Sequence, residues 1–226
     1  MEDNINKMFL DKKDFQKLDE SIIKYFENFN EYMMMYNCAI KEIRTKFEVL
    51  NDDLSVTYKR NPIEIIKTRI KSPKSIFEKL SRNNLELSMD SILNNINDVA
   101  GIRVICSFID DIYEIAQMLV SQDDIKLLRV KDYIKNPKEN GYRSYHMIIE
   151  IPVFFAKRKQ AIKVEVQLRT IAMDFWASLE HSMKYKKEIP NTKSVAAELK
   201  KCADIISSTD IKMQEINKMI NDISLD

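Results

Sequence analysis

The stretch AIKVEVQLRT at residues 161–170 decides the fold, because apolar and polar side chains alternate along it. Alternate residues of a β-strand share a face, so Val164, Val166 and Leu168 are predicted to point into a core. The opposite face then carries four polar side chains: Lys163, Glu165, Gln167 and Arg169. An ordinary half-solvated strand shows the same alternation, so the neighbouring segments must indicate whether this face is functional.

The segment NPKENGYRSYH at residues 136–146 carries the residue types of a nucleotide site. Gly141 frees the backbone for a turn, and Tyr142 beyond it offers a ring that could stack on a base. In a strand, His146 would share a face with Tyr142 and Ser144 and could donate to a phosphate or ribose oxygen. The alternatives are core packing for Tyr142 and a satisfied, buried imidazole for His146.

Hydrophobic periodicity along the chain predicts an α+β fold, in which a mixed sheet is flanked by long helices. Strands are expected at 101–108, 125–132 (at an edge), 144–151 and 161–169. Helices are expected at 14–50, from Pro62, from Ser72, at 110–121, at 171–186 and at 194–223, with a polar break at 51–60 and another break at Pro190. Pro62 is placed at a helix start because proline is tolerated in a first turn.

The last expected helix carries an apolar stripe in alternating steps of four and three, which is a heptad pattern. Its members are Val195, Leu199, Cys202, Ile206, Thr209, Met213, Ile216, Ile220 and Ile223. The stripe could pack on the N-terminal helix of the same chain, or part of it could pair between subunits. Spacing alone favours neither partner.

Composition excludes several classes of protein. A chain of 226 residues with 45% hydrophobic and 31% charged residues can bury a sizeable core. A net charge of +1 argues against a bulk electrostatic binder of nucleic acid. No signal peptide and no membrane-spanning stretch is expected. The widely separated Cys38, Cys106 and Cys202 fit neither a disulfide framework nor a metal site, which indicates a reducing cytoplasm.

Two distant carboxylates are candidates for a metal site. Asp98 directly precedes the strand expected at 101–108. If that strand pairs beside 161–169, Asp98 and Glu165 converge on one point. Two carboxylates that leave positions open for phosphate and water are how proteins hold Mg²⁺. Taken alone, Asp98 is more simply a cap or loop aspartate.

The basic segment RIKSPKSIFEK at residues 69–79 is a candidate phosphate site. Ser75 and Lys79 would lie one turn apart on a helix that begins after Ser72. Arg69 and Lys71 would precede that helix in an extended piece. Cations and a hydroxyl at a helix N-terminus can cradle a phosphate, although a lone basic run is more simply a solvated patch.

Five motifs follow one another in a specific order. They are Arg69-x-Lys71-x-x-x-Ser75-x-x-x-Lys79, Asp98-x-x-Gly101-x-Arg103, the segment from Tyr133 to His146, Glu165-Val166-Gln167-Leu168-Arg169-Thr170, and Trp176-Ala177-x-Leu179-Glu180-His181. Together they resemble the synthetase domain of the RelA/SpoT-type (p)ppGpp synthetase family, over about residues 62–187. The long N-terminal helix and the heptad-like tail resemble the single-domain small alarmone synthetases, closest to the RelQ-like group.

The resemblance implies a nucleotidyltransferase-like core and a Mg²⁺-dependent reaction. Pyrophosphate would move from ATP to the 3′-hydroxyl of GDP or GTP, which gives ppGpp or pppGpp and AMP. Asp98 and Glu165 would hold Mg²⁺, and Glu165 would be the candidate acceptor of the 3′-hydroxyl proton. Arg69 and Arg103 would sandwich adenine, and the ATP phosphates would contact Lys71, Ser75 and Lys79. The guanosine nucleotide would stack on Tyr142 and be oriented by Lys138, His146 and Gln167, with Asn140 and Gly141 shaping the turn.

The resemblance also implies one synthetase domain without a hydrolase domain. Residues 1–61 would form a helical extension, 62–187 the catalytic core and 188–226 an oligomerisation helix of a homotetramer. A hydrolase domain needs a His-Asp metal site, whereas the two histidines here, His146 and His181, fall in synthetase motifs. His181 and Trp176 are expected to brace their helix against the sheet. An allosteric alarmone or single-stranded RNA is a further partner that the resemblance allows; a membrane is not.

Two other functions compete with synthesis. A regulatory module of the same fold would bind guanosine nucleotides or RNA with little turnover, but the presence of both Asp98 and Glu165 argues against it. A nucleotidyltransferase would usually show a Gly-Ser pair followed by Asp-x-Asp, and neither pattern occurs here.

Overall fold

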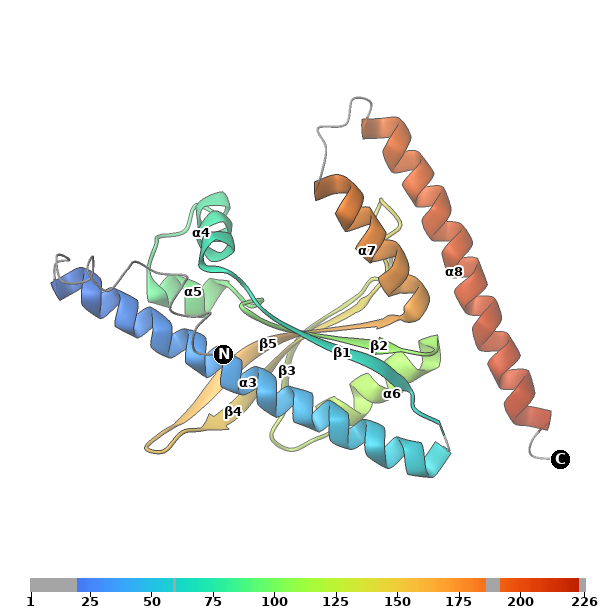
Figure 1. Cartoon of the computed structure of the whole chain (residues 1–226), viewed down its shortest axis with the longest axis horizontal. Coiled ribbons are helices and arrows are strands. Elements are labelled where there is room, and N and C mark those ends of the chain that lie inside the picture. The colour runs from blue at the N-terminus through green and yellow to red at the C-terminus, as the bar shows by residue number, and fades with distance from the viewer. Residues whose placement is uncertain (1–19, 59, 186–191, 224–226) are drawn as a thin grey trace.

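A five-stranded mixed sheet in the order β1-β2-β5-β4-β3 forms the centre of the computed structural model, which describes residues 20–58, 60–185 and 192–223 (Figure 1). The strands are β1 (Ile63–Ile70), β2 (Ala100–Cys106), β3 (Lys126–Asp132), β4 (Tyr145–Phe154) and β5 (Lys159–Thr170). Strands β2 and β5 are parallel and the other neighbours are antiparallel. The pairing of β2 beside β5 is the arrangement on which the predicted meeting of Asp98 and Glu165 depends.

Helices cover both faces of the sheet. On one face, α3 (Glu20–Tyr58) crosses β1, β2, β5 and β4, and α6 (Ile109–Val120) packs beside it (Figure 1). The other face holds α4 (Pro73–Arg82), α5 (Met89–Asn95) and α7 (Ile171–Tyr185). The last helix, α8 (Thr192–Ile223), lies outside the sheet and packs on α7 and α6.

The core lies between the sheet and the pair α3 and α6. Val164, Val166 and Leu168 of β5 are fully buried, as their alternation predicted. They join one cluster with Phe47 of α3 and Ile115 of α6. Because apolar residues take every second position of β5, its remaining side chains face the opposite side of the sheet. The functional face is therefore the face that α3 does not cover.

The helix predicted from Pro62 is wrong, since residues 63–70 form edge strand β1. This segment, IEIIKTRI, is rich in β-branched residues, which pack well on a pleated surface and lose rotamer freedom in a helix. The polar break predicted at 51–60 is also wrong for most of its length, because α3 continues to Tyr58 and Leu54 is buried. The short helix α5 was not predicted; its N-cap Ser88 accepts a hydrogen bond from the Ser91 amide.

The other predicted elements are confirmed within a few residues, and β3 does lie at an edge. The predicted helix start at residue 14 and the break at Pro190 lie outside the described residues. Among the described residues, no helix combines the length and the apolarity needed to cross a bilayer.

Of the two partners left open for the apolar stripe of the last helix, the N-terminal helix of the same chain is not the one observed. Figure 1 places α3 and α8 on different sides of the molecule, and α8 contacts α7 and α6 instead. Trp176 does not brace α7 against the sheet either: its indole N–H donates to the Leu199 carbonyl of α8 at 3.0 Å. His181 is exposed.

Candidate active site

The register of the sheet sets two rows of side chains across all five strands on the functional face. The first row is Arg69 of β1, Gly101 of β2, Glu165 of β5, Ile148 of β4 and Arg129 of β3. The second row is Lys67, Arg103, Gln167, His146 and Lys131, in the same strand order. Gly101 has no side chain, so the surface between Arg69 and Glu165 is bare. Residues from four of the five predicted motifs thus meet on or around one surface.

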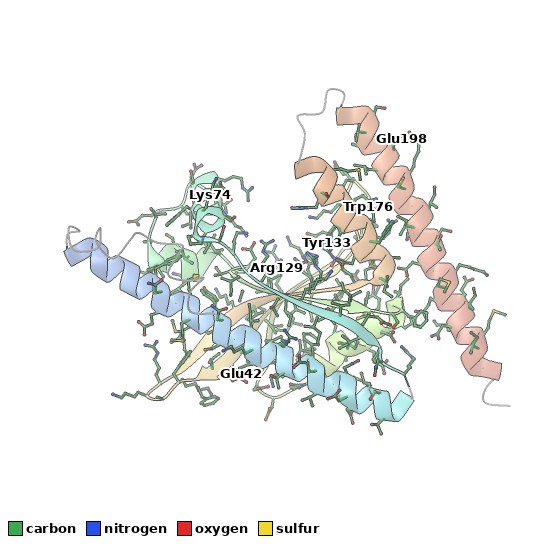
Figure 2. The ribbon with its side chains drawn as sticks, viewed as in Figure 1. Glu42, Lys74, Arg129, Tyr133, Trp176 and Glu198 are labelled. Atoms are coloured by element: carbon green, nitrogen blue, oxygen red, sulfur yellow. The ribbon has the colours of Figure 1, made fainter. Side chains whose placement is uncertain are left out.

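A pocket of about 340 Å³ opens above these rows. Figure 2 shows Arg129 and Tyr133 in this region, between α4 and α7 and across the sheet from α3. The lining combines both candidate metal ligands with cations and aromatic groups: Lys79, Asn95, Asn97, Asp98, Arg129, Lys131, Tyr133, Lys138, His146, Ile148 and Glu165. The predicted convergence of Asp98 and Glu165 is therefore confirmed.

Asp98 is held by the two lysines of the basic segment. Lys71 Nζ donates to one carboxylate oxygen at 2.9 Å and Lys79 Nζ to the other at 2.7 Å. Burial favours a higher pKa for Asp98, but the hydrogen bonds and charges of Lys79 and Lys71 outweigh it, so the pKa lies below its usual value. The carboxylate is therefore ionised at neutral pH and the two ammonium groups lie beside it.

Glu165 is held from the β4 side of the pocket. Gln167 Nε2 donates to its carboxylate at 2.9 Å, and His146 Nδ1 lies 3.6 Å from it. Burial again favours a higher pKa, but the interactions with His146 and Gln167 outweigh it and the pKa of Glu165 is lowered. Glu165 is therefore a half-buried anion that faces the same pocket as Asp98.

The two carboxylates suit a hard cation whose remaining ligands come from phosphate oxygens and water. Within the described residues, no group of three or more His, Cys, Asp or Glu side chains could enclose a metal. Mg²⁺ is commonly held by one or two carboxylates together with phosphate oxygens and water, since it dehydrates reluctantly. Asp98 and Glu165 match that pattern, and the neighbouring lysines supply further charge for phosphate.

On the α4 side of the pocket, residues 72–75 form a capped helix N-terminus beside Asp98. Ser72 caps α4, its hydroxyl accepts from the Ser75 amide at 3.3 Å, and Pro73 occupies the first turn. Ser75 and Lys79 lie one turn apart, as predicted. Arg69 is exposed on β1, whereas the guanidinium of Arg103 donates to Asp174 of α7 at 3.2 Å.

On the β4 side of the pocket, Tyr142 and His146 come together as predicted. The Tyr142 hydroxyl lies 2.9 Å from His146 Nε2 and accepts from Arg169 Nη2 at 2.6 Å. Lys138 Nζ lies 4.9 Å from the centroids of both Tyr142 and Tyr133, within cation–π range. Ser144 departs from the prediction, because it is fully buried and bonds the Leu168 carbonyl.

The turn beneath Tyr142 is shaped by Asn140 and Gly141. The Asn140 side chain accepts from the Tyr142 amide at 3.2 Å and donates to Glu180 of α7 at 3.1 Å. Gly141 has a φ of +86°, and a Cβ there would lie 2.4 Å from the Cβ of Ala203 on α8. The turn at Asn140 and Gly141 therefore packs directly on the C-terminal helix α8.

Sequence reasoning missed several residues of the site, four of which contribute a charge or an aromatic ring. Arg129 and Lys131 line the pocket from β3, and the alternation in KLLRVKD at 126–132 could have shown that they share a face. Tyr133 belongs to a recognised motif but was given no role. No local sequence pattern indicated a role for Asp174, because its partners come from three different strands.

Comparison with known proteins identifies relatives along most of the chain. Residues 68–190 match the region described as found in RelA/SpoT proteins. GTP pyrophosphokinase YwaC of Bacillus subtilis (strain 168) is 43% identical over 195 residues, which are 86% of this chain and 93% of that protein. GTP pyrophosphokinase YjbM of the same organism is 32% identical over 190 residues, which are 84% of this chain and 89% of that protein.

Solved structures share the same mixed sheet and helical flanks. Small alarmone synthetase 1 from Bacillus subtilis, bound to its product pppGpp, superposes with a TM-score of 0.78 at 32% identity, covering 86% of this chain and 98% of that chain. Small alarmone synthetase 2 from Bacillus subtilis gives a TM-score of 0.76 at 42% identity, covering 85% and 99%. The fold class predicted from the sequence is thereby confirmed.

Proposed function

The chain belongs to the RelA/SpoT family, and from this premise we propose that it is a (p)ppGpp synthetase. It transfers pyrophosphate from ATP to the 3′-hydroxyl of GDP or GTP, and the products are ppGpp or pppGpp and AMP. The observation that carries the proposal is the pocket that Asp98 and Glu165 share between a lysine-bearing helix end and an aromatic wall. The relatives named GTP pyrophosphokinases and the pppGpp-bound neighbour support it.

The donor nucleotide binds on the α4 side of the pocket. Lys71 and Lys79, which pair with Asp98 in the structure, turn to the ATP phosphates together with Ser75. Arg69 and Arg103 lie on adjacent strands and hold the adenine between their flat guanidinium groups. Asp98 and Glu165 would hold Mg²⁺, which would supply positive charge to offset the negative charge of the transferred group.

The acceptor nucleotide binds on the β4 side. Guanine stacks on Tyr142, which requires Lys138 to leave the ring and places its ammonium group near the bound nucleotide. His146 and Gln167, which contact Glu165, orient the ribose so that Glu165 can accept the 3′-hydroxyl proton. Arg129 and Lys131 line the remaining wall and suit the 5′-phosphates.

The functional assembly is a homo-oligomer, a tetramer by family resemblance, that works in the cytoplasm. Four apolar residues of α7 at steps of four are exposed in the single chain: Ile171, Phe175, Leu179 and Met183. The outer side of α8 adds Met213, Ile216 and Ile220, also exposed. Such contiguous apolar surface suits another subunit, so residues 188–226 serve as the oligomerisation segment beside the core at 62–187. An allosteric alarmone or single-stranded RNA remains a prediction of the resemblance.

Nucleotide analysis tests the proposed reaction. Purified protein is incubated with ATP, GDP and Mg²⁺, and the nucleotides are resolved by anion-exchange chromatography. AMP and a guanosine nucleotide modified at the 3′-position should accumulate together, and chelation of the metal by EDTA should stop both. Release of inorganic pyrophosphate in place of AMP would indicate a nucleotidyltransferase. Guanosine-nucleotide binding without any product would indicate the regulatory module.

A further inference from the structure

Asp174 of α7 belongs to none of the roles assigned above, yet three cations converge on it. Its carboxylate accepts hydrogen bonds from Lys67 Nζ at 3.0 Å, Arg103 Nη1 at 3.2 Å and Arg169 Nη1 at 3.0 Å. Lys67 comes from β1, Arg103 from β2 and Arg169 from β5. One side chain on a helix therefore gathers donors from three adjacent strands.

Two of these cations lead to different sides of the pocket. Arg103 lies on the donor side, where it is proposed to hold adenine. Arg169 uses its second terminal nitrogen, Nη2, to donate to the Tyr142 hydroxyl at 2.6 Å, and its guanidinium carbon lies 5.1 Å from the Tyr142 ring centroid. Asp174 is thus the shared acceptor of a donor-side arginine and of the arginine that fixes the acceptor-side ring.

Two charged side chains, Arg103 and Arg169, depend on Asp174 as a hydrogen-bond acceptor. Arg169 is 4% exposed, and the Nε atoms of both Arg103 and Arg169 are buried without a hydrogen-bond partner among the described residues. Burial, together with repulsion between the two guanidinium groups, lowers the pKa of Arg103. Removing the shared carboxylate would leave two neighbouring cations, the buried Arg169 and the partly exposed Arg103, with fewer acceptors, which is unfavourable. Their expected response is to move apart.

We infer that Asp174 is a positioning residue that holds Arg103 and Arg169 at a fixed separation, so that the adenine and guanine subsites keep their geometry together. The inference rests on the proposed synthetase function, since it concerns the two nucleotides of that reaction. A purely structural ion cluster would attach α7 to the sheet and leave both nucleotide affinities unchanged. Measured nucleotide affinities therefore distinguish the positioning role of Asp174 from a purely structural one.

The test measures binding and turnover for Asp174→Asn, Asp174→Glu and a matched control. Asp111→Asn is the control, because Asp111 is also a buried carboxylate paired with an arginine, Arg60, but lies outside the pocket. Affinities are measured with a fluorescent GDP derivative and with a non-hydrolysable ATP analogue, and stability by thermal unfolding. Loss of a charged hydrogen-bond acceptor should weaken both nucleotides by about 10-fold or more in Asp174→Asn.

Asp174→Glu, which restores the charge, should recover part of both affinities. The control Asp111→Asn should lose thermal stability and still bind both nucleotides as the wild type does. An Asp174→Asn variant that loses only stability, or that weakens only one nucleotide, would overturn the inference. Absence of product from the wild-type protein would overturn the synthetase proposal instead, so the two failures are distinguishable.

A second variant keeps the inference testable should Asp174→Asn not fold. Arg169→Lys preserves the charge, but a single ammonium group cannot bond Asp174 and the Tyr142 hydroxyl in the same geometry. GDP affinity should fall by about 10-fold, whereas affinity for the ATP analogue should stay within about twofold, because Arg103 keeps its bond to Asp174. Unchanged GDP affinity, or an equal loss for both nucleotides, would contradict the positioning role.

Discussion

Glu165 carries the largest share of the proposed chemistry for a single residue. It faces Asp98 across the pocket, and its pKa is lowered because contacts with His146 and Gln167 outweigh the effect of burial. Replacement by glutamine removes the negative charge and keeps the shape. We expect Glu165→Gln to abolish synthesis and to leave the circular dichroism spectrum and the melting temperature close to those of wild type. A variant with normal turnover would remove Glu165 from the mechanism.

Tyr142 tests the assignment of the acceptor side. Loss of a stacked ring costs about 1–3 kcal/mol in binding, so Tyr142→Ala should weaken GDP binding by roughly one to two orders of magnitude. ATP-analogue affinity should change much less, because the ring lies on the β4 side of the pocket. Isothermal titration with each nucleotide checks this. Equal losses for both nucleotides would show that Tyr142 does not stack on guanine.

Gly141 is a residue whose backbone no other amino acid adopts easily. Its φ is +86°, and an added Cβ would meet Ala203 at 2.4 Å. We expect Gly141→Ala to destabilise the protein by about 1–3 kcal/mol and to weaken GDP binding, because Tyr142 follows it directly. Gly101→Ala is the matched stability control, since a Cβ there would meet only the Arg69 carbonyl, at 3.6 Å. Similar urea midpoints for the two variants would contradict the strain argument.

At the scale of single elements, α8 buries only part of its apolar stripe. Leu199 and Ile206 pack against the cluster that contains Trp176 and Ala203, whereas Met213, Ile216 and Ile220 are exposed. The stripe therefore does not pack as one seam within the chain. Its inner part attaches α8 to α7, and its exposed outer part is the surface that we propose joins another subunit.

The double substitution Met213→Lys and Ile216→Lys tests this division. Charges on the outer face should prevent subunit contact, so the sedimentation coefficient should fall while the melting temperature of the monomer changes little. Ser208→Lys serves as the control, because Ser208 is exposed on the same helix but lies outside the stripe. An unchanged sedimentation coefficient in the double variant would show that this face does not join subunits.

At the scale of the whole molecule, partly buried ion clusters connect distant elements. Asp98, which precedes β2, pairs with Lys79 of α4, and Asp174 joins α7 to the sheet. For both, burial favours a higher pKa but the cations outweigh it, so each pKa is lower in the folded protein than in the unfolded chain. Such groups stabilise the fold above their unfolded pKa, and this stabilisation is lost as the pH falls through the folded pKa.

Stability is therefore expected to hold near neutral pH and to decline as the pH drops below about 4, the unfolded value of an aspartate. Urea unfolding from pH 7 to pH 3 measures the decline. In Asp174→Asn one contributing carboxylate is absent, so the gap in free energy of unfolding between wild type and variant should narrow toward pH 3. A gap that stays constant over this range would show that the charge of Asp174 does not stabilise the fold.

The sequence was most informative where a pattern is short in range. The alternation around Glu165 fixed its strand and its face, because side-chain direction in a strand follows from residue parity alone. Ser72 and Pro73 marked the start of α4 through capping chemistry that acts within one turn. For residues 63–70 the prediction of a helix was wrong, since proline suits a helix start and a strand start equally. The β-branched residues of this segment favour the strand, and pairing with β2 stabilises it.

By itself, the sequence determined the strand faces, the helix ends and the kinds of side chain that could serve a nucleotide. Only the tertiary structure decided which of them meet: Asp98 with Lys71 and Lys79, Asp174 with cations from three strands, and α8 with α7 in place of α3. The reason is physical. Local patterns fix the direction of a side chain relative to its own backbone, whereas these contacts depend on strand order and on the parallel pairing of β2 with β5, which join residues far apart along the chain.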